Sequence, residues 1–335
     1  MLFNYSLFPH DIEKLQVFLE HIVLEVWCKS KRNDVFSKSL LHPSFSVLYD
    51  RKNKLYKDIE EIYNLIKTLN KTKKDFIKKA FITNNKIEDL CSENTSGFFY
   101  ISLERETNTN LAIKIKDFNN YLYKFLDKKD ASFVKNFTSI ADYYKLLVSQ
   151  LPNSICPFCG ISDINSEKLT KRDAFDHYLP KSLLPFTAIN IKNLAPMCKD
   201  CNQDWKHDIN PINTDKDKGS SRKTFFPFNN SAYVIDISIK KLEINPSYEK
   251  DKHIIDIDYD CEGHCDEVKT WLELFNINNR YDDLIRKSLR FWLEEWRIIK
   301  NNPLTQEEYI QNKISNKFIN TNFLNLAVIE FRKDL

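Results

Sequence analysis

Two Cys-x-x-Cys pairs constrain this chain more than any other feature of its sequence. Cys156 and Cys159 form the first pair, and Cys198 and Cys201 form the second after a gap of 38 residues. Four thiolates are the preferred tetrahedral ligands of a structural zinc ion, whereas reduced core thiols or a redox pair need no such matched spacing. The pairs therefore predict a zinc-stapled unit that flanks one compact motif.

The segment between and just behind these pairs carries the side chains of a hydrolytic site. His177 follows Asp176, Asn193 lies further along, and Asn202 comes directly after the last cysteine. Phosphodiester hydrolysis needs a base that takes a proton from water and a cation that neutralises charge on the phosphate oxygens. A neutral imidazole suits the base. Asp176 and Asn202 offer oxygen ligands for Mg²⁺ or Mn²⁺.

Taken together, these residues resemble the HNH endonuclease superfamily. Its ββα-metal finger carries an Asp-His pair on the first strand, an Asn entering the second strand, and an Asn or His opening the helix. The resemblance covers about residues 151–215 and extends to the subgroup with two zinc-binding Cys pairs. It implies that Asn193 orients the base His177, that Asp176 and Asn202 bind the catalytic cation, and that DNA is cut to leave 5′-phosphate and 3′-hydroxyl ends.

The same resemblance implies a biological setting. Bacterial HNH proteins with large additional regions resemble components of phage-defence systems, in which a partner protein often restrains the nuclease. We therefore expect an antiviral role and a regulatory protein partner. The sequence does not indicate an oligomeric state.

Further polar residues near the motif are weaker candidates. Lys181 and Lys206 are expected to contact substrate phosphates, although each alone is an ordinary solvated charge. His207 is a second possible ligand of the cation. A regular helix would turn it about 140° away from Asn202, which favours a surface role.

A second group of metal-binding residue types lies near residue 261. Cys261, His264 and Cys265 supply three ligands without an evident fourth, so a second metal site would be incomplete. Cys28 and Cys91 are expected to be buried thiols. Abundant cysteine without a signal peptide indicates a reducing, cytoplasmic compartment.

Length and hydrophobic spacing predict an α+β, mainly helical protein with three regions. A chain of 335 residues is long enough for two or three compact units. We expect a helical domain over 1–130, the nuclease domain over 131–225, and a strand hairpin followed by helices over 226–335.

The predicted elements follow apolar periodicity. Helices are expected at 11–27, at 53–83 as two helices, at 117–127, at 131–150 and across 266–300. Extended segments are expected at 98–104 and 111–115, a surface loop at 216–223, and a hairpin from strands at 233–239 and 253–259.

Charge decides little. The net charge is +3, and no apolar run is long enough for a membrane span. The stretch 51–80 carries ten Lys or Arg against four Asp or Glu, and Arg286, Arg290 and Arg297 share one helix face. Both could contact phosphates, but a solvated surface explains them equally well.

The sequence thus predicts an HNH-type DNA endonuclease with structural zinc and a Mg²⁺ or Mn²⁺ ion. Two alternatives stay open. One is a non-catalytic zinc-ribbon module that binds nucleic acid, and the other is a nuclease that cleaves RNA.

Overall fold

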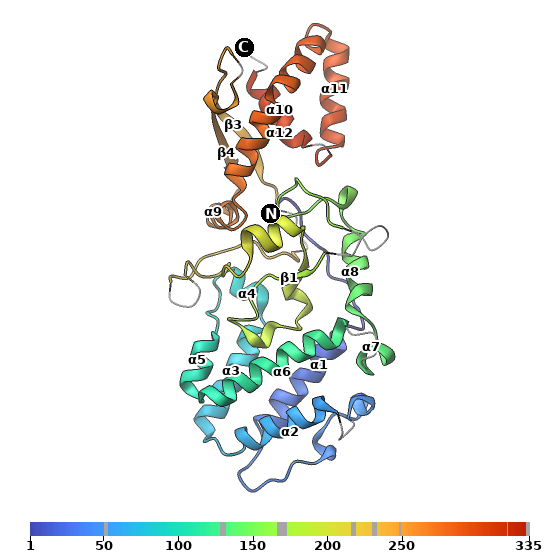
Figure 1. Cartoon of the computed structure of the whole chain (residues 1–335), viewed down its shortest axis with the longest axis vertical. Coiled ribbons are helices and arrows are strands. Elements are labelled where there is room, and N and C mark those ends of the chain that lie inside the picture. Colours follow the sequence, from blue (N-terminus) through green and yellow to red (C-terminus); the bar gives the residue numbers. More distant parts are fainter. Residues whose placement is uncertain are drawn as a thin grey trace.

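Helices dominate the structure, and its two small sheets are antiparallel. The computed structural model describes residues 1–49, 53–127, 132–165, 173–215, 219–229, 233–247, 249–319 and 321–332. The parts succeed one another along the long axis of the molecule, with the N-terminal helices at one end, β1 near the middle, and β3, β4 and the last helices at the other end (Figure 1). This architecture confirms the predicted α+β, mainly helical class.

The N-terminal region is a group of helices, as expected. Asn53 and Asn70 begin two of them, since their side chains accept hydrogen bonds from the backbone N–H groups of Tyr56 and Lys73 at 2.9 and 3.0 Å. Residues 51–52 of the basic stretch lie outside the described residues. The elements are α1 (Glu13–Glu20), the π-helical η1 (His21–Trp27), η2 (Lys38–Leu40), η3 (Pro43–Leu48), α2 (Lys54–Ile66), α3 (Lys71–Asn84), α4 (Ile87–Cys91), α5 (Tyr100–Glu106) and α6 (Thr109–Asp127).

The expectation of extended segments at 98–104 and 111–115 was wrong. These residues fall largely in α5 and in the first part of α6. Leu111, Ile115 and Phe118 are buried at intervals of four and three residues, which only a helix places on one side. Burial on this face outweighs the strand preference of the aromatic and β-branched residues.

The predicted helix over 131–150 is also interrupted. It consists of α7 (Ser132–Asn136) and α8 (Ile140–Val148), and residue 131 lies outside the described residues. Ser139 ends the interruption by capping α8, since its Oγ accepts a hydrogen bond from Asp142 N at 3.3 Å.

The central unit is a short hairpin followed by a helix. Strand β1 (Phe175–His177) pairs antiparallel with β2 (Leu194–Pro196), so that Asp176 faces Ala195 across the ladder. The π-helical η7 (Asp200–Lys206) follows β2 and begins within the second cysteine pair. Three short helical turns complete the unit: η4 (Pro152–Ser154), η5 (Pro185–Thr187) and η6 (Ile191–Asn193). The order strand, strand, helix agrees with the predicted ββα arrangement.

The C-terminal hairpin forms as predicted, with slightly shifted limits. Strand β3 (Asp236–Glu243) pairs antiparallel with β4 (Ile254–Asp260), with an irregularity between Ile239 and Lys241. The helical stretch expected over 266–300 divides into two at Asn276, which has a positive φ of 48°. The remaining elements are η8 (Lys250–Lys252), α9 (Cys265–Leu274), α10 (Ile277–Ile299), α11 (Pro303–Ser315) and α12 (Asn322–Arg332).

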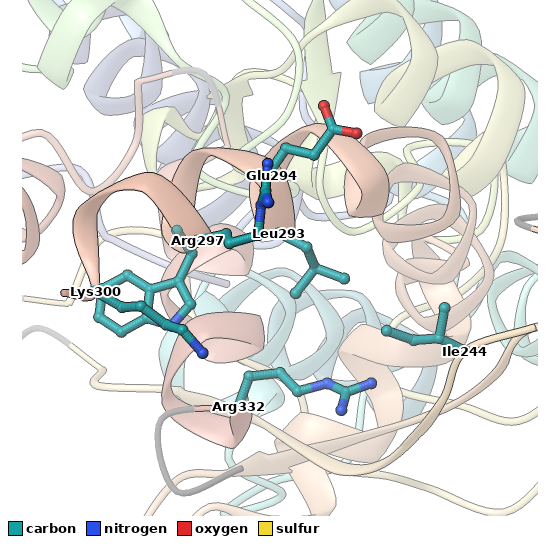
Figure 2. A pocket seen from close by; sticks show the side chains of 7 residues that line it. Ile244, Leu293, Glu294, Arg297, Lys300 and Arg332 are labelled. Carbon is teal, nitrogen blue, oxygen red and sulfur yellow. The ribbon is translucent and has the colours of Figure 1, made fainter. Parts of the chain in front are cut away.

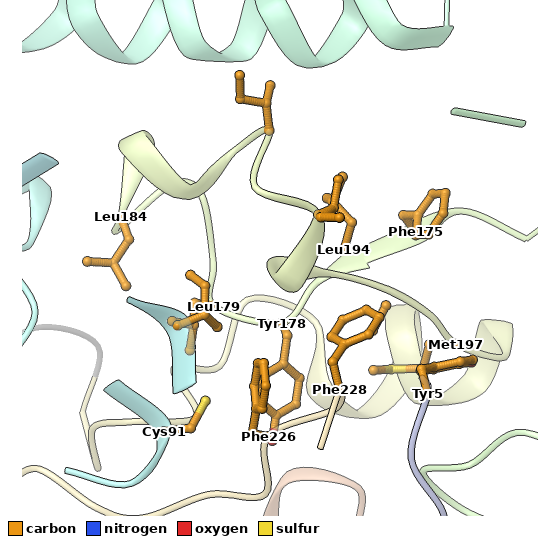
Figure 3. Packing of buried hydrophobic residues seen from close by; sticks show 14 of the residues in the cluster. Tyr5, Cys91, Phe175, Tyr178, Leu179, Leu184, Leu194, Met197, Phe226 and Phe228 are labelled. Carbon is orange, nitrogen blue, oxygen red and sulfur yellow. The ribbon is translucent and has the colours of Figure 1, made fainter. Parts of the chain in front are cut away.

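The first residues of the chain run through the centre of the molecule. Leu2 N donates to Pro157 O at 2.8 Å, and the Tyr5 hydroxyl donates to Pro196 O at 2.7 Å. Figure 3 shows Tyr5 close to Met197 in the buried cluster around Tyr178. The core therefore joins segments from distant parts of the sequence, and the limits 1–130, 131–225 and 226–335 stay predictions. The predicted loop 216–223 lies partly outside the described residues. None of the described helices is long and apolar enough to cross a membrane.

Candidate metal centre and nuclease site

The four paired cysteines meet at one buried point. The Sγ atoms of Cys156, Cys159, Cys198 and Cys201 all lie within 4.8 Å of one another. Cys159 Sγ and Cys198 Sγ are 3.9 Å apart. A tetrahedral zinc site with Zn–S bonds of about 2.3 Å places its sulfur atoms about 3.8 Å apart. The cluster therefore fits a metal such as zinc, and it is the only such group that the described residues form.

Local backbone geometry prepares the first pair for a metal. Gly160 has a φ of +65°, and its N–H donates to Cys156 O at 2.8 Å. The next amide, that of Ile161, donates to Cys159 Sγ at 3.4 Å. This tight turn brings both sulfur atoms to the same side of the loop.

Helices far away in the sequence hold the cysteine loop. Trp271 Nε1 donates to Phe158 O at 2.6 Å, and the Tyr281 hydroxyl donates to Cys159 O at 2.8 Å. Arg280 donates to Cys201 Sγ at 3.3 Å. Burial lowers the pKa of Arg280, but the charges of Cys201 and Cys159 raise it by a larger amount, so the net shift of this pKa is upward. Sequence reasoning missed these residues because nothing in their spacing links them to the cysteines.

His177 is half-buried and held in one orientation. Its Nε2 lies 3.0 Å from Ala188 O, and because a carbonyl only accepts, Nε2 carries the hydrogen. The ring packs edge-on against Tyr123 of α6, with centroids 4.4 Å apart. Burial, with the charges of Lys181 and Lys206, lowers the pKa of His177 to about 3. The imidazole is thus neutral at cellular pH, with Nδ1 free of hydrogen.

Asn193 was expected to orient His177, but its side chain hydrogen-bonds to the loop that follows β1. Its Oδ1 accepts from Leu179 N at 2.7 Å, and its Nδ2 donates to Leu179 O at 2.9 Å and to Thr187 Oγ1 at 3.0 Å. Asn193 therefore ties together the loop between β1 and β2. The same loop supplies the Ala188 carbonyl that contacts His177.

Asp176 contacts a buried lysine. Lys206 Nζ lies 2.9 and 3.2 Å from the two carboxylate oxygens and 3.3 Å from His177 O. The exposed fraction is 0% for Lys206 and 4% for Asp176. Burial raises the pKa of Asp176, while Lys206 opposes that shift. Lys206 was expected to contact substrate phosphates, but it is turned inward and cannot reach them in this arrangement.

The other candidate residues lie around the same hairpin. Asn202 Nδ2 donates to Ala174 O at 3.1 Å, which leaves its Oδ1 as the possible ligand atom. Lys181 Nζ lies over the Tyr123 ring at 4.2 Å, and burial lowers its pKa. His207 is exposed, with Nδ1 3.1 Å from an oxygen of Asp208.

The second cysteine group does not assemble into a metal site among the described residues. Cys261 is buried whereas Cys265 is exposed, and His264 Nδ1 lies 3.1 Å from Glu267 Oε1. Cys91 is buried as expected, and Cys28 is partly buried. Burial raises the pKa of Cys28 to about 12, so this thiol is protonated.

Comparisons with known proteins give one distant similarity. The chain is similar to the Septu protein PtuB of Bacillus thuringiensis, with 31% identity over 77 residues. The aligned part is 22% of this chain and 29% of that protein, so most of the relative's length is not covered. No family model matches the chain, and no solved structure matches it.

Proposed function

We propose that this protein is an HNH-type endonuclease that hydrolyses DNA phosphodiester bonds. The observation that carries the proposal is the placement of His177 on β1, with its ring oriented by the Ala188 carbonyl. This contact leaves Nδ1 as the ring nitrogen that can accept a proton from water. The adjacent cysteine cluster supplies the rigid support that such a base requires.

Lys181 is the proposed phosphate contact. It packs on the same tyrosine ring as His177 and is close enough to lower the pKa of that histidine. A partly buried ammonium group gains more from a phosphate than a fully solvated one does. Lys181 would therefore hold the substrate near the base.

A Mg²⁺ or Mn²⁺ ion on Asp176 and Asn202 belongs to the proposal, but the fit is incomplete. When bound, such an ion would neutralise charge that develops on the phosphate oxygens. In the arrangement described above, however, the Asp176 carboxylate already forms an ion pair with the Lys206 ammonium group. An ion at this place would have to replace Lys206.

We also propose a role in defence against phage, together with a regulatory protein partner. Two indications support it: the resemblance of the HNH-like motif to defence nucleases, and the similarity to a Septu protein over part of the chain. A reducing cytoplasm suits both the thiol cluster and this role.

The Asp176–Lys206 ion pair favours a second candidate function. A carboxylate that is buried and paired with a lysine is less accessible to a cation, which suits a non-catalytic zinc module that binds nucleic acid. In that case the cysteine cluster would shape a binding surface, and His177 would be a packing residue.

A cleavage assay separates these functions. Purified protein is incubated with supercoiled plasmid DNA or structured RNA, with Mg²⁺, with Mn²⁺, or without divalent ions. The proposal expects nicking of DNA, and loss of a general base in His177→Ala should slow it about 10²- to 10⁴-fold. The matched control is His207→Ala, which removes an exposed imidazole next to η7 and should cleave normally.

The outcomes are distinct. Unchanged cleavage by His177→Ala would assign the chemistry to another residue. Nucleic-acid binding without any cleavage would favour the zinc module, and cleavage of RNA alone would make the protein a ribonuclease.

The cation is tested separately through Asn202. Asn202→Ala should raise the Mg²⁺ or Mn²⁺ concentration needed for half-maximal cleavage, because few protein ligands hold the ion. Gln203→Ala, at the exposed neighbouring position, is the control. Identical metal titrations for Asn202→Ala, Gln203→Ala and the parent would rule out Asn202 as a ligand.

A further inference from the structure

Helix α10 carries a row of basic side chains along one face. Arg286, Arg290, Arg297 and Lys300 are spaced by four, seven and three residues, which places them within about 80° of one another around the helix. Near Lys300 at the end of this row, Arg332 of α12 lines the same hollow as that lysine. We call these five residues the α10 basic face.

Two hollows lie along this face. One, of about 430 Å³, is lined by Arg297, Lys300 and Arg332 together with the apolar Leu293 and Ile244. In Figure 2 Arg332 and Ile244 lie on the side of this hollow opposite to the helix that carries Leu293. The second, of about 410 Å³, is lined by Arg286, Arg290 and Lys250, among others. Glu294 borders both hollows, so they are neighbours on one surface.

Among the described residues, ion pairs engage two of the five basic groups on this surface. Arg286 is paired with Asp282 at 2.6 Å and also donates to the carbonyls of Lys250 and His253, which gives it a structural role. Glu294 is already paired with Arg290 at 3.1 Å. Arg332 Nε is buried, and within the described part of the chain it has no hydrogen-bond partner.

Arginine is scarce in this chain, which makes the cluster informative. Of the 50 basic residues only ten are arginine, and four of those ten line the two hollows. An abundance of lysine explains scattered surface charge but does not gather arginine on one helix. The planar guanidinium group pairs with two phosphate oxygens at once, which a lysine cannot do.

We propose that the α10 basic face binds the phosphodiester backbone of duplex DNA, away from His177. From Arg286 to Lys300 the chain rises by 14 helical steps, or about 21 Å, which matches about six nucleotides of one strand at 3.4 Å each. A free mononucleotide would fill one hollow and leave the rest of the row unused. The choice of DNA rests on the proposed nuclease function, whereas the polyanion site rests on the geometry of α10 alone.

Salt dependence of binding tests this proposal directly. Fluorescence anisotropy with a labelled duplex is measured between about 50 and 200 mM salt without divalent ions, using His177→Ala as the parent so that no cleavage interferes. The slope of log K against log salt is negative, and each lost phosphate contact reduces its magnitude by about 0.9. The added double change Arg297→Ala/Lys300→Ala should therefore make the slope shallower by about 1.8 and weaken binding across this range of salt concentrations.

The matched control removes two exposed lysines elsewhere. Lys57→Ala/Lys71→Ala changes the net charge equally, and these residues belong to the basic stretch of α2 and α3. The proposal expects the control to keep the parent slope. It is overturned if the α10 double variant keeps the parent slope as well, or if the control makes the slope shallower by as much.

Competition distinguishes a nucleic-acid strand from smaller anions. Unlabelled duplex should displace the labelled one, whereas ATP and inorganic phosphate at equal phosphate concentration should not. Displacement by ATP as effective as that by the duplex would mean a mononucleotide site and would overturn the proposal. A parent that binds through α10 while the wild-type protein cuts no DNA would refute the nuclease function and leave this inference standing.

Discussion

The two sides of the central hairpin-helix unit differ in how complete they are. On one side, four buried cysteines form a cluster that could hold a metal such as zinc. On the other side, a single carboxylate is already engaged by Lys206, and the oriented His177 stands beside it. The protein supplies all four side chains of the cysteine cluster, whereas the proposed nuclease side would need a cation and a substrate in addition.

Under the proposed function, the same short segment would serve two purposes. A structural site gains stability from saturating every ligand position, while a catalytic site must leave positions for water and substrate. The ion pair with Lys206 keeps the second side stable when no cation is present. Substitutions on each side should therefore have effects of different size and kind.

The largest effect is expected from the cysteine cluster. Cys156→Ser removes one of four ligands, and structural zinc contributes on the order of 10 kcal/mol to a small metal-folded unit, so the central unit should unfold. Zinc content by mass spectrometry and thermal unfolding measure this. Cys265→Ser, at an exposed cysteine outside the cluster, is the control and should change neither. A folded, zinc-free Cys156→Ser protein would contradict the prediction.

The next effect is expected from Lys206. Lys206→Met leaves the Asp176 charge buried and unpaired, which should cost about 3–5 kcal/mol in the free energy of unfolding. The double variant Lys206→Met/Asp176→Leu removes both charges and should recover most of the loss. Urea denaturation measures both variants. Lys240→Met breaks an exposed pair with Asp258 and should have little effect. Equal stability of Lys206→Met and the parent would show that the pair does not persist in solution.

A smaller effect on the metal side is expected from Arg280. Arg280→Met removes the hydrogen bond to Cys201 Sγ and the charge that balances the thiolates. Loss of such an outer contact typically weakens metal affinity about 10- to 100-fold. Competition with a chromophoric chelator measures zinc affinity, and Arg105→Met on distant α5 is the control. Zinc affinity that equals that of the parent would limit Arg280 to a packing role.

The smallest effect is expected from Tyr281. Tyr281→Phe removes only the hydroxyl that donates to Cys159 O, and one such bond contributes about 1 kcal/mol to folding. Tyr259→Phe is the matched control, because its hydroxyl bonds to Asn278 near the surface. Unfolding in urea should show a larger loss of stability for Tyr281→Phe than for Tyr259→Phe. The reverse order would argue against the contribution of α10 to the cysteine loop.

The sequence predicted the parts of the site that depend on spacing. The two cysteine pairs converge, and the pattern of alternating residues predicted the C-terminal hairpin. These features depend on local geometry, and the residue order records that geometry directly.

The remaining parts depend on contacts that leave no local pattern. The group that orients His177 is a backbone carbonyl at Ala188, which any residue type would provide. Lys206 looks like a solvated charge until its burial is known, and Arg280 lies 79 residues beyond the cysteine that it contacts. The helical state of 111–115 likewise depends on what α6 packs against, because its two isoleucines favour a strand whereas its leucine, alanine and lysine favour a helix.

The long-range hydrogen bonds to the cysteine loop bear on the order of events during protein synthesis. The last cysteine, Cys201, leaves the ribosome 80 residues before Tyr281, which at about 5–20 residues per second is an interval of about 4–16 s. Until then the carbonyls of Phe158 and Cys159 lack their partners from α9 and α10. A nascent chain could thus bind metal at four thiols before the loop is locked. Under the proposed function, the nuclease side would acquire this support only after α9 and α10 have left the ribosome.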